Sequence, residues 1–376
     1  MAFIVDIDRI TPAELERKLA EVLREQLSSV DWLRRSTVES AKSSDNGWDL
    51  RASVPLPTGG KAVLCVECKL HFQPSQFLGI KDRPCHAGSS KHVRRVLAMP
   101  FITPRMAAIC QENDWSWFDL AGNCYLNIPG VLMIERAGHE PIRVRRSGGA
   151  NLGSPEAARI VRALLSPENA GQRWTQRDMV GHFSKLEAPI PAPSLALVNK
   201  VVKHLRDQGF VESLPNRGFR VRDYEGLLQA WRDVYRLDRH ARRRYFTLLQ
   251  GRSLHEKLRA LESGGAGLIA YAAFSAAEFQ AAYVRQPRTW LYVHSSLEHQ
   301  LQTSLETKVV DSGENLVVFI PDDMGVFYRL ETAPNRLACT NVVQTYVDVA
   351  HAGGRGDEAA EALLQQRLKP AWAAAQ

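Results

Sequence analysis

The chain has 376 residues, of which 45% are hydrophobic and 24% charged, and its formal net charge is +7. This length gives room for two or three domains, and the composition is that of an ordinary globular protein. No stretch approaches the roughly 20 consecutive apolar residues of a membrane span, and the N-terminus lacks the basic start and apolar core of a signal peptide. The six cysteines show no framework spacing, so we expect a cytoplasmic protein without disulfides and without a membrane partner.

Residues 1–146 are predicted to form a first domain that combines helices and strands. Thr11, followed by Pro12 and Glu14, is typical of a helix N-terminus, and the apolar residues after it recur at helical spacing. The turn Pro57–Gly60 separates two of the expected strands. We expect strands at residues 32–40, 48–56, 61–69, 96–101, 124–128 and 131–136, and a second helix from Thr103 to about Trp117.

Two acidic residues and a lysine stand at the ends of the second and third of these strands. Asp49 opens one strand, and Glu67-Cys68-Lys69 closes the next. An Asp followed by Glu-x-Lys on the partner strand of a hairpin resembles the pattern of the PD-(D/E)xK nucleases. The resemblance implies a restriction-endonuclease-like fold for residues 1–146.

The residue types in this pattern suit metal-dependent cleavage of DNA. Asp49 and Glu67 would hold Mg²⁺ or Mn²⁺, because hard cations prefer carboxylate oxygens, and the metal would activate a water molecule. Lys69 lies two residues beyond Glu67, so both side chains share one strand face, and the ammonium group would stabilise developing negative charge. Glu21 on the first helix is the candidate for a third catalytic carboxylate. The alternative is a solvated charge pair at a strand edge, without catalysis.

The Cys65-x-x-Cys68 spacing also occurs in zinc sites. On a strand, however, residues three apart point to opposite faces, so these two thiolates would diverge. Cys85 and His86 are too isolated in the sequence to complete such a site. We therefore expect no structural zinc.

Residues 154–225 are predicted to form three helices followed by a two-stranded hairpin. Ser154, Thr175 and Ser194 are the expected N-cap residues, since each precedes apolar residues at helical spacing. We expect helices at residues 154–165, 176–183 and 194–205, and strands at 210–214 and 219–222. This order and the sequence LVNKVVKHLRDQGFVE resemble winged-helix transcription regulators, which implies a DNA-binding domain.

The third of these helices is the expected recognition helix, whose N-terminal half would enter the major groove. Asn199 is a candidate for pairing with adenine, and Lys200 and Lys203 suit phosphates. Arg217 and Arg220 in the hairpin would contact the DNA backbone or a minor groove. The predicted DNA-binding residues are Ser194, Asn199, Lys200, Lys203, His204, Arg217 and Arg220.

Positive charge is concentrated in the middle of the chain. Residues 151–245 contain 17 Lys and Arg against 10 Asp and Glu, whereas residues 246–376 contain 11 against 14. A polyanion such as duplex DNA would be attracted to the middle segment. The alternatives are a solvated basic surface and a winged helix that contacts only protein.

Residues 226–376 are predicted to form a helical connector followed by an α/β domain. The connector is expected to be a basic helix from Trp231 to Tyr245, and two later helices would flank a glycine-rich break at Gly353–Gly356. We expect strands at residues 268–273, 289–294, 307–310, 316–320 and 327–330.

Three segments carry a second family resemblance. GLIAYAAFSAAEF and VVQTYVDVAHAGGRGDEAAEALL resemble the C-terminal region of AbiEi-type proteins, the antitoxins of type IV toxin–antitoxin systems. VLAMPFITPRMAAICQENDWSWFDLAGNCYL in the first domain resembles related regulators. The resemblance implies control of transcription from the protein's own operon and a cognate toxin as partner, although such antitoxins generally carry the winged helix at the N-terminus.

These patterns predict a multidomain α/β (α+β) protein that binds double-stranded DNA in a sequence-specific manner and regulates transcription, as an AbiEi-like antitoxin or autorepressor. This function needs no cofactor, and a homodimer is an expected assembly. The first alternative is a Mg²⁺- or Mn²⁺-dependent DNA endonuclease directed by its winged helix. The second is a non-catalytic scaffold for protein interactions.

Overall fold

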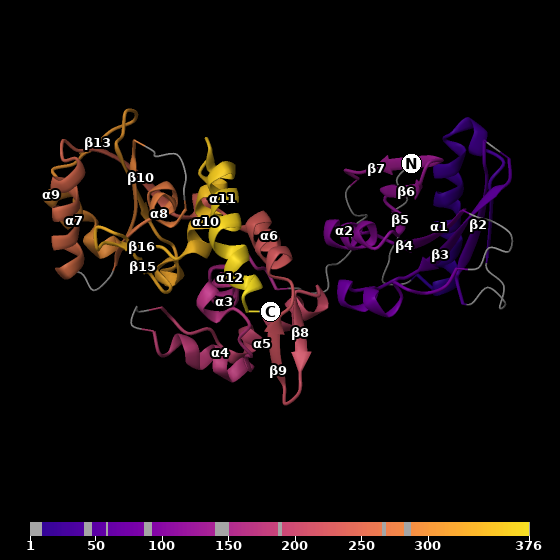
Figure 1. Ribbon diagram of the computed structural model, residues 1–376, viewed down its shortest axis with the longest axis horizontal. Helices are drawn as coiled ribbons and strands as arrows, with labels where there is room; N and C mark the ends of the chain where they lie inside the picture. Colours follow the sequence, from indigo (N-terminus) through magenta and orange to yellow (C-terminus); the bar gives the residue numbers. More distant parts are fainter. Residues whose placement is uncertain are drawn as a thin grey trace. The chain divides into compact units, whose positions relative to one another are not determined.

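The structure is a computed structural model that describes residues 10–40, 47–57, 59–85, 92–139, 150–186, 190–264, 268–281 and 287–375. The chain divides into two compact units, residues 1–148 and 149–376 (Figure 1). The division falls between the predicted domains 1–146 and 154–225, where residues 140–149 lie outside the described residues. Each unit combines helices with a β-sheet of seven strands, which confirms the predicted α/β class.

The first unit contains a mixed sheet whose seven strands are neighbours in chain order. The β1–β2–β3 meander is antiparallel, β4 and β5 join it in parallel, and β6 and β7 complete the sheet as an antiparallel hairpin. The strands are β1 (Thr37–Ser40), β2 (Leu50–Pro55), β3 (Lys61–Cys68), β4 (His92–Met99), β5 (Ser116–Asp119), β6 (Cys124–Ile128) and β7 (Leu132–Arg136).

Helices cover both faces of this sheet. The helix α1 (Pro12–Ser28) packs Leu15, Leu19 and Leu23 against one face, where alternate strand residues such as Leu64 and Val66 are buried. The opposite face packs against the 3-10 helix η3 (Pro74–Gly79) and the helix α2 (Pro104–Glu112). Cys68 belongs to the α1 side and Cys65 to the α2 side. The expectation that these two thiols point to opposite faces is therefore confirmed.

Several predicted bounds in the first unit were wrong. Trp32 belongs to the 3-10 helix η2 (Asp31–Leu33), and only residues 37–40 of the expected first strand are extended. The expected helix 103–117 ends at Glu112, because Asp114 adopts a left-handed backbone conformation with φ of 62°. The chain then enters β5, which has Trp117 and Phe118 buried. A strand with both faces covered lacks polar alternation, so its pattern resembles the end of a buried helix.

The second unit begins with three helices and a hairpin, close to the predicted bounds. These elements are α3 (Pro155–Leu165), α4 (Gln176–Phe183), α5 (Leu195–Asp207), β8 (Val211–Leu214) and β9 (Gly218–Val221). The hydroxyl groups of Ser154, Thr175 and Ser194 accept hydrogen bonds from the third backbone N–H of their helices. All three predicted N-caps are confirmed. Trp174 also pairs with Phe219 through two backbone hydrogen bonds, which ties the start of α4 to the hairpin.

A second mixed sheet follows, with strand order β13-β10-β14-β12-β11-β16-β15. Its strands are β10 (Ala241–Phe246), β11 (Ile269–Tyr271), β12 (Thr289–Val293), β13 (Lys308–Val309), β14 (Leu316–Ile320), β15 (Glu331–Thr332) and β16 (Ala338–Cys339). The accompanying helices are α6 (Tyr224–Val234), η5 (Leu237–Arg239), α7 (Gly251–Gly264), α8 (Ala273–Gln280), η6 (Ser295–Leu297), α9 (Glu298–Ser304), η7 (Met324–Phe327), α10 (Val342–His351), α11 (Gly356–Leu363), the π-helical turn η8 (Leu364–Leu368) and α12 (Lys369–Ala373).

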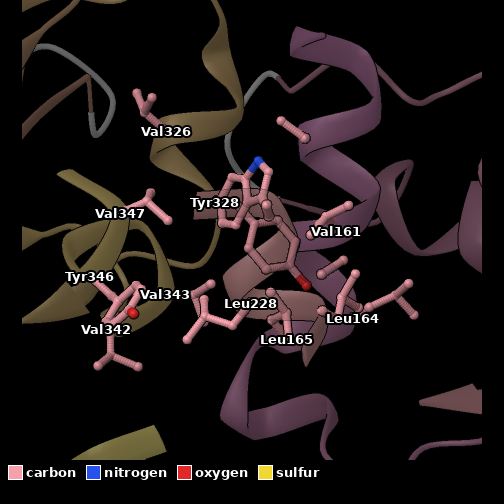
Figure 2. Close-up of a cluster of buried hydrophobic side chains, with 14 of the residues drawn as sticks. Val161, Leu164, Leu165, Leu228, Val326, Tyr328, Val342, Val343, Tyr346 and Val347 are labelled. Atoms are coloured by element: carbon pink, nitrogen blue, oxygen red, sulfur yellow. The ribbon is translucent and has the colours of Figure 1, made fainter. Parts of the chain in front are cut away.

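The three-helix segment and the second sheet share one hydrophobic core, so the core continues without a break across residue 225. Figure 2 shows buried side chains of α3, α6 and α10 packed together with Val326 and Tyr328 of the segment around η7. The other face of the second sheet packs against α7 and α9. Because α3 contributes to both the hairpin side and the sheet side, the helices and the sheet form one body.

A buried polar network crosses this shared core. Arg162 on α3 donates from Nε to Gln344 Oε1 on α10 at 2.8 Å. The same Gln344 donates from Nε2 to Asp348 Oδ1 at 2.7 Å, and Asp348 Oδ1 also accepts from the hydroxyl groups of Tyr235 and Tyr292. Burial raises the pKa of Asp348 and lowers that of Arg162. The amide of Gln344 therefore separates a buried cation from a buried carboxyl group and binds both.

Two predicted elements of the second unit were wrong. The expected basic helix 231–245 does not exist as such: α6 ends at Val234, and residues 241–246 form β10. In β10, the backbone pairs with β14 and β13, and Tyr245 is buried beneath the sheet. Four exposed residues precede Tyr245 in this strand, so no apolar period distinguished strand from helix. The expected strand 327–330 does not form: Phe327 is the last residue of η7, which is capped by Asp323, and a turn follows it.

None of the helices in the described part of the chain combines the length and the apolar character needed to cross a bilayer.

Candidate functional site

The helix α5 buries one apolar face and, apart from Leu195 and Ala196 at its start, exposes polar residues on the opposite side. Val198, Val201, Val202 and Leu205 are fully buried in the core of the second unit. On the opposite side, the exposed residues recur three and four positions apart and therefore form one stripe. The stripe consists of Ala196, Asn199, Lys200, Lys203 and Arg206. Arg206 belongs to it although the recognition-helix prediction omitted that residue.

The amide of Asn199 is held by a neighbour on α4. Gln176, the first residue of α4, donates from Nε2 to Asn199 Oδ1 at 3.1 Å. The bond fixes which end of the Asn199 amide faces Gln176 and leaves its NH₂ group with donors to spare. Gln176 was not predicted as a site residue. Its signal in the sequence was its place directly after the N-cap Thr175, where a side chain can reach the neighbouring helix.

Two predicted DNA-binding residues on α5 have structural roles that limit their reach. The hydroxyl of Ser194 accepts the Leu197 N–H at 3.2 Å as the N-cap, although the residue is exposed. His204 is only half exposed, and burial lowers the pKa of its imidazole. His204 therefore lies at the margin of the exposed stripe rather than on it.

The hairpin presents three further arginines. Arg217 is exposed at the turn, where Asn216 and Arg217 both have φ of 59°. Arg220 forms an ion pair with Glu212 directly across the hairpin, so part of its charge is already neutralised. Arg222 follows β9 and is exposed. Within the described ranges, neither Arg217 nor Arg222 has a side-chain ion pair or hydrogen bond.

The positive charge of residues 151–245 is not all located in the three helices and the hairpin. Six of the arginines counted in residues 151–245 fall between Arg232 and Arg244, in or next to α6 and β10 rather than in the hairpin segment. Several of them are engaged: Arg232 pairs with Asp357, and Arg243 with Glu298. The net charge of the middle segment therefore overstated that of the three helices and hairpin. The local surface, with Lys200, Lys203 and Arg206 together, is nevertheless basic.

In the first unit, the predicted catalytic residues lie at one end of the sheet. Asp49 donates from its backbone N–H to Val66 O at 3.0 Å, and its Oδ2 accepts from Cys68 N at 2.7 Å. Lys69 lies 2.5 Å from Glu67 Oε1 in an ion pair. The structure thus brings Asp49, Glu67 and Lys69 to the same strand ends.

An arginine that was not predicted occupies the second oxygen of Glu67. Arg83 donates from Nη1 to Glu67 Oε2 at 2.5 Å and from Nη2 to Gly47 O at 2.8 Å. Its guanidinium carbon lies 5.1 Å from the centroid of the Trp48 ring. Glu67 is only 3% exposed, so its carboxylate is enclosed between two cations.

The prediction that Glu21 supplies a third carboxylate is not supported by its surroundings. Glu21 is exposed on α1 and pairs with Arg17, one helical turn earlier, at 2.8 Å. Glu16 is the helix residue within electrostatic reach of the motif: burial raises its pKa, Asp49 raises it further, and Lys69 opposes the shift. Because α-helical neighbours repeat at three or four residues, Glu16 and Glu21 do not share one face of α1.

The residues at this sheet end do not fit a divalent cation as they are arranged. Both oxygens of Glu67 are engaged by cations, and Glu16 approaches from the α1 side whereas Glu67 lies on the α2 side. No group of three or more His, Cys, Asp or Glu residues in the described ranges is placed to hold a metal ion. This arrangement therefore does not favour a metal-dependent step at this position.

The expectation of a chain without disulfides was wrong. Cys65 on β3 and Cys85 are joined by a disulfide, with their Cα atoms 6.1 Å apart. The other cysteines, Cys68, Cys110, Cys124 and Cys339, are free and buried. Spacing in the sequence did not reveal the pair, because the two cysteines are 20 positions apart and the 3-10 helix η3 lies between them.

The comparisons with known proteins give no further guidance to the family. No protein-family model matches the chain, and no match was found among the curated proteins or the solved structures.

Proposed function

We propose that residues 154–225 form a winged-helix domain and that the protein is a sequence-specific double-stranded-DNA-binding regulator of transcription. One observation carries this proposal. The stripe of α5 that the core does not use displays Asn199, Lys200, Lys203 and Arg206 to solvent. A recognition helix needs this combination of a base-reading amide and phosphate-binding cations.

The placement of α5 within the domain suits insertion into a major groove. Its inner face packs against α3 and α4, and the hairpin follows immediately. With α5 in the groove, Arg217 and Arg222 on the hairpin would lie on the side of the adjoining DNA backbone. Lys200, Lys203 and Arg206 would bind phosphates along the groove walls.

Asn199 is the candidate for direct readout of a base. An asparagine amide pairs bidentately with adenine N6 and N7, and this pairing requires a defined amide orientation. The hydrogen bond from Gln176 supplies that orientation. Gln176 is thus a positioning residue in the proposal, and Asn199 is the residue that would touch the base.

The regulator role follows from the family resemblance rather than from the site. An AbiEi-like antitoxin would repress its own operon and bind a cognate toxin, and a homodimer would match two half-sites in the operator. DNA cleavage is the alternative of another class. The closed carboxylate of Glu67 does not favour it.

The test is selection of a binding site from a random duplex library with the full-length protein, followed by titration of the selected site and of a scrambled duplex. Asn199→Ala should cost about 1–3 kcal/mol on the selected site and little on scrambled DNA, because one base contact is lost. Gln176→Ala should weaken the same base preference to a smaller extent. Lys203→Ala should weaken binding to both duplexes alike.

A matched control is Arg252→Ala, which removes an arginine with a 92% exposed side chain from α7 of the same unit. It should bind both duplexes as the wild type does. Failure of the wild type to enrich any sequence, or equal losses on both duplexes for Asn199→Ala and Lys203→Ala, would contradict the proposal.

A further inference from the structure

The two segments that meet at Glu67 are joined twice. One segment is residues 65–67 of β3, and the other is residues 83–85, which follow η3. Cys65 is bonded to Cys85 by the disulfide, and Glu67 is bonded to Arg83 by the ion pair. In both segments the two residues are two positions apart. The covalent and ionic connections are therefore neighbours between the same pieces of chain.

The alternation of side chains explains why the connections meet on one face. Cys65 and Glu67 are two residues apart on a strand, so both point to the side covered by η3 and α2. After the 3-10 helix η3 the chain returns to that side, where Cys85 is bonded to Cys65 and Arg83 lies at the end of β3. Arg83 and Glu67 each lie two residues from one of the bonded cysteines. The disulfide therefore holds Arg83 near Glu67 at a high effective concentration.

The 83–85 segment also makes non-covalent contacts with the residues around Trp48. Trp48 Nε1 donates to Pro84 O at 3.0 Å, and the Arg83 guanidinium lies against the Trp48 ring. Arg83 is partly exposed, as is Cys85. Without the disulfide, the ordering of this segment would rest on non-covalent contacts alone, and conformational entropy would oppose it.

We propose that the Cys65–Cys85 disulfide is a redox latch that holds Arg83 on Glu67, and that its reduction by a dithiol frees one oxygen of the Glu67 carboxylate. This inference is independent of the proposed DNA-binding function. The oxidation state of the two cysteines thus determines whether the buried carboxylate of Glu67 is accessible.

The redox step balances with a dithiol as the reductant. One thiolate of the dithiol attacks a sulfur of the disulfide, and Cys85 is the more accessible target because Cys65 is buried. The Cys65–Cys85 bond breaks and Cys65 leaves as a thiolate, which takes up a proton. The second thiol of the reagent then displaces Cys85 and closes a cyclic disulfide. The protein gains two electrons and two protons, and the dithiol is oxidised.

The opened site consists of Glu67 with Lys69 as its remaining cation. Lys69 stays beside Glu67 because it directly follows β3, and its backbone N–H is bonded to Ala98 O. Release of Arg83 would give a carboxylate oxygen to solvent or to another ligand. In the oxidised form both oxygens of Glu67 are engaged by cations, which is one reason that the acidic motif does not fit a divalent cation.

The test measures Glu67 directly in the full-length protein. Carboxylates are amidated with a water-soluble carbodiimide and glycine ethyl ester, and modification of Glu67 is quantified by peptide mass spectrometry. The protein is compared as isolated in the oxidised form and after treatment with dithiothreitol and anaerobic desalting. Glu21 is the internal reference, because it is exposed and belongs to neither segment.

We expect reduction to increase Glu67 amidation by at least about tenfold, the factor that corresponds to about 1.4 kcal/mol of lost interaction. Arg83→Ala should give high amidation in both redox states, and Cys85→Ser should give it without reductant. The matched control Cys339→Ser removes a buried free cysteine from the other unit and should retain the wild-type response.

Two results would overturn the latch. The first is unchanged Glu67 amidation in wild-type protein whose Cys65 and Cys85 are shown by alkylation to be thiols. The second is alkylation of all six cysteines in denatured, unreduced protein, where the disulfide leaves four available. The comparison of the two wild-type forms involves no substitution, so a variant that fails to fold does not decide the outcome.

Discussion

The salt dependence of DNA binding can be worked out from the exposed cations of α5 and the hairpin β8–β9. Five of them, Lys200, Lys203, Arg206, Arg217 and Arg222, are exposed and have no side-chain ion pair with any described residue. Each can therefore neutralise a phosphate without first breaking an internal pair. Arg220 differs, because a phosphate would have to replace Glu212 as its partner.

Five phosphate contacts predict a steep dependence. Each contact releases condensed counterions, so log K should fall with log salt at a slope of about −4.5, or roughly 500-fold between 50 and 200 mM salt. Lys203→Ala should reduce the slope to about −3.6, because one contact is lost. Arg220→Ala should change the slope less than Lys203→Ala does, because Arg220 is already paired with Glu212.

Fluorescence anisotropy of a labelled duplex, titrated with full-length protein at a series of salt concentrations, measures these slopes. Arg252→Ala on α7 is the control and should leave the slope unchanged. A wild-type slope shallower than about −2 would mean that no more than two phosphates are contacted. That result, or equal slopes for Lys203→Ala and Arg252→Ala, would refute the assignment of this surface to DNA.

Three further predictions concern the stability of the second unit. Each is measured by urea denaturation, with hydrogen exchange of α5 and α10 as the readout. Gln344→Leu should cost about 3 kcal/mol or more, because Arg162 would be left buried without its acceptor, whereas Gln365→Leu at an exposed position of the C-terminal helix should cost little. Leu205→Ala should cost about 2–5 kcal/mol by opening a cavity beneath α5. Burial lowers the pKa of His182 and His204 in the folded state, so the unfolded chain takes up protons first. The contribution of these histidines to the free energy of unfolding should therefore be fully present above about pH 6.5 and decrease as the pH drops through the folded-state pKa values. Replacement of both histidines by Asn should abolish this decrease.

The elements that the sequence predicted well are those with strong local signals. The N-caps Ser154, Thr175 and Ser194 combine a side-chain acceptor with apolar residues at helical spacing behind it, and all three act as predicted. The strand 316–320 has five apolar residues in succession and was predicted with its observed bounds. Such signals depend only on neighbours along the chain, so no tertiary information was needed.

The residues that were missed depend on contacts between distant segments. Arg83 reaches Glu67 only because the chain returns to β3 after η3, and no spacing rule links positions 67 and 83. The strand β10 is extended because β14 offers it a hydrogen-bonding edge, while its own four exposed residues were compatible with a helix. Glu16 rather than Glu21 faces the motif because the rotation of α1 is set by its packing on the sheet. The sequence could indicate the motif, but not what encloses it.

The composition of α5 bears on whether its exposed stripe is more than a solvated surface. A helix that only needs solubility usually mixes charges of both signs, because pairs of opposite charge three or four residues apart stabilise it. The helix α1 follows that rule, with Arg17 bonded to Glu21 and Lys18 to Glu14. In α5 no acidic residue occurs before Asp207, the last position of the helix, and the cations of its stripe lie next to one another without compensation. The repulsion between them costs stability, and a polyanion bound along the stripe would relieve it. A partner that is itself cationic would not, so the charge of α5 favours DNA over a basic protein surface as its ligand.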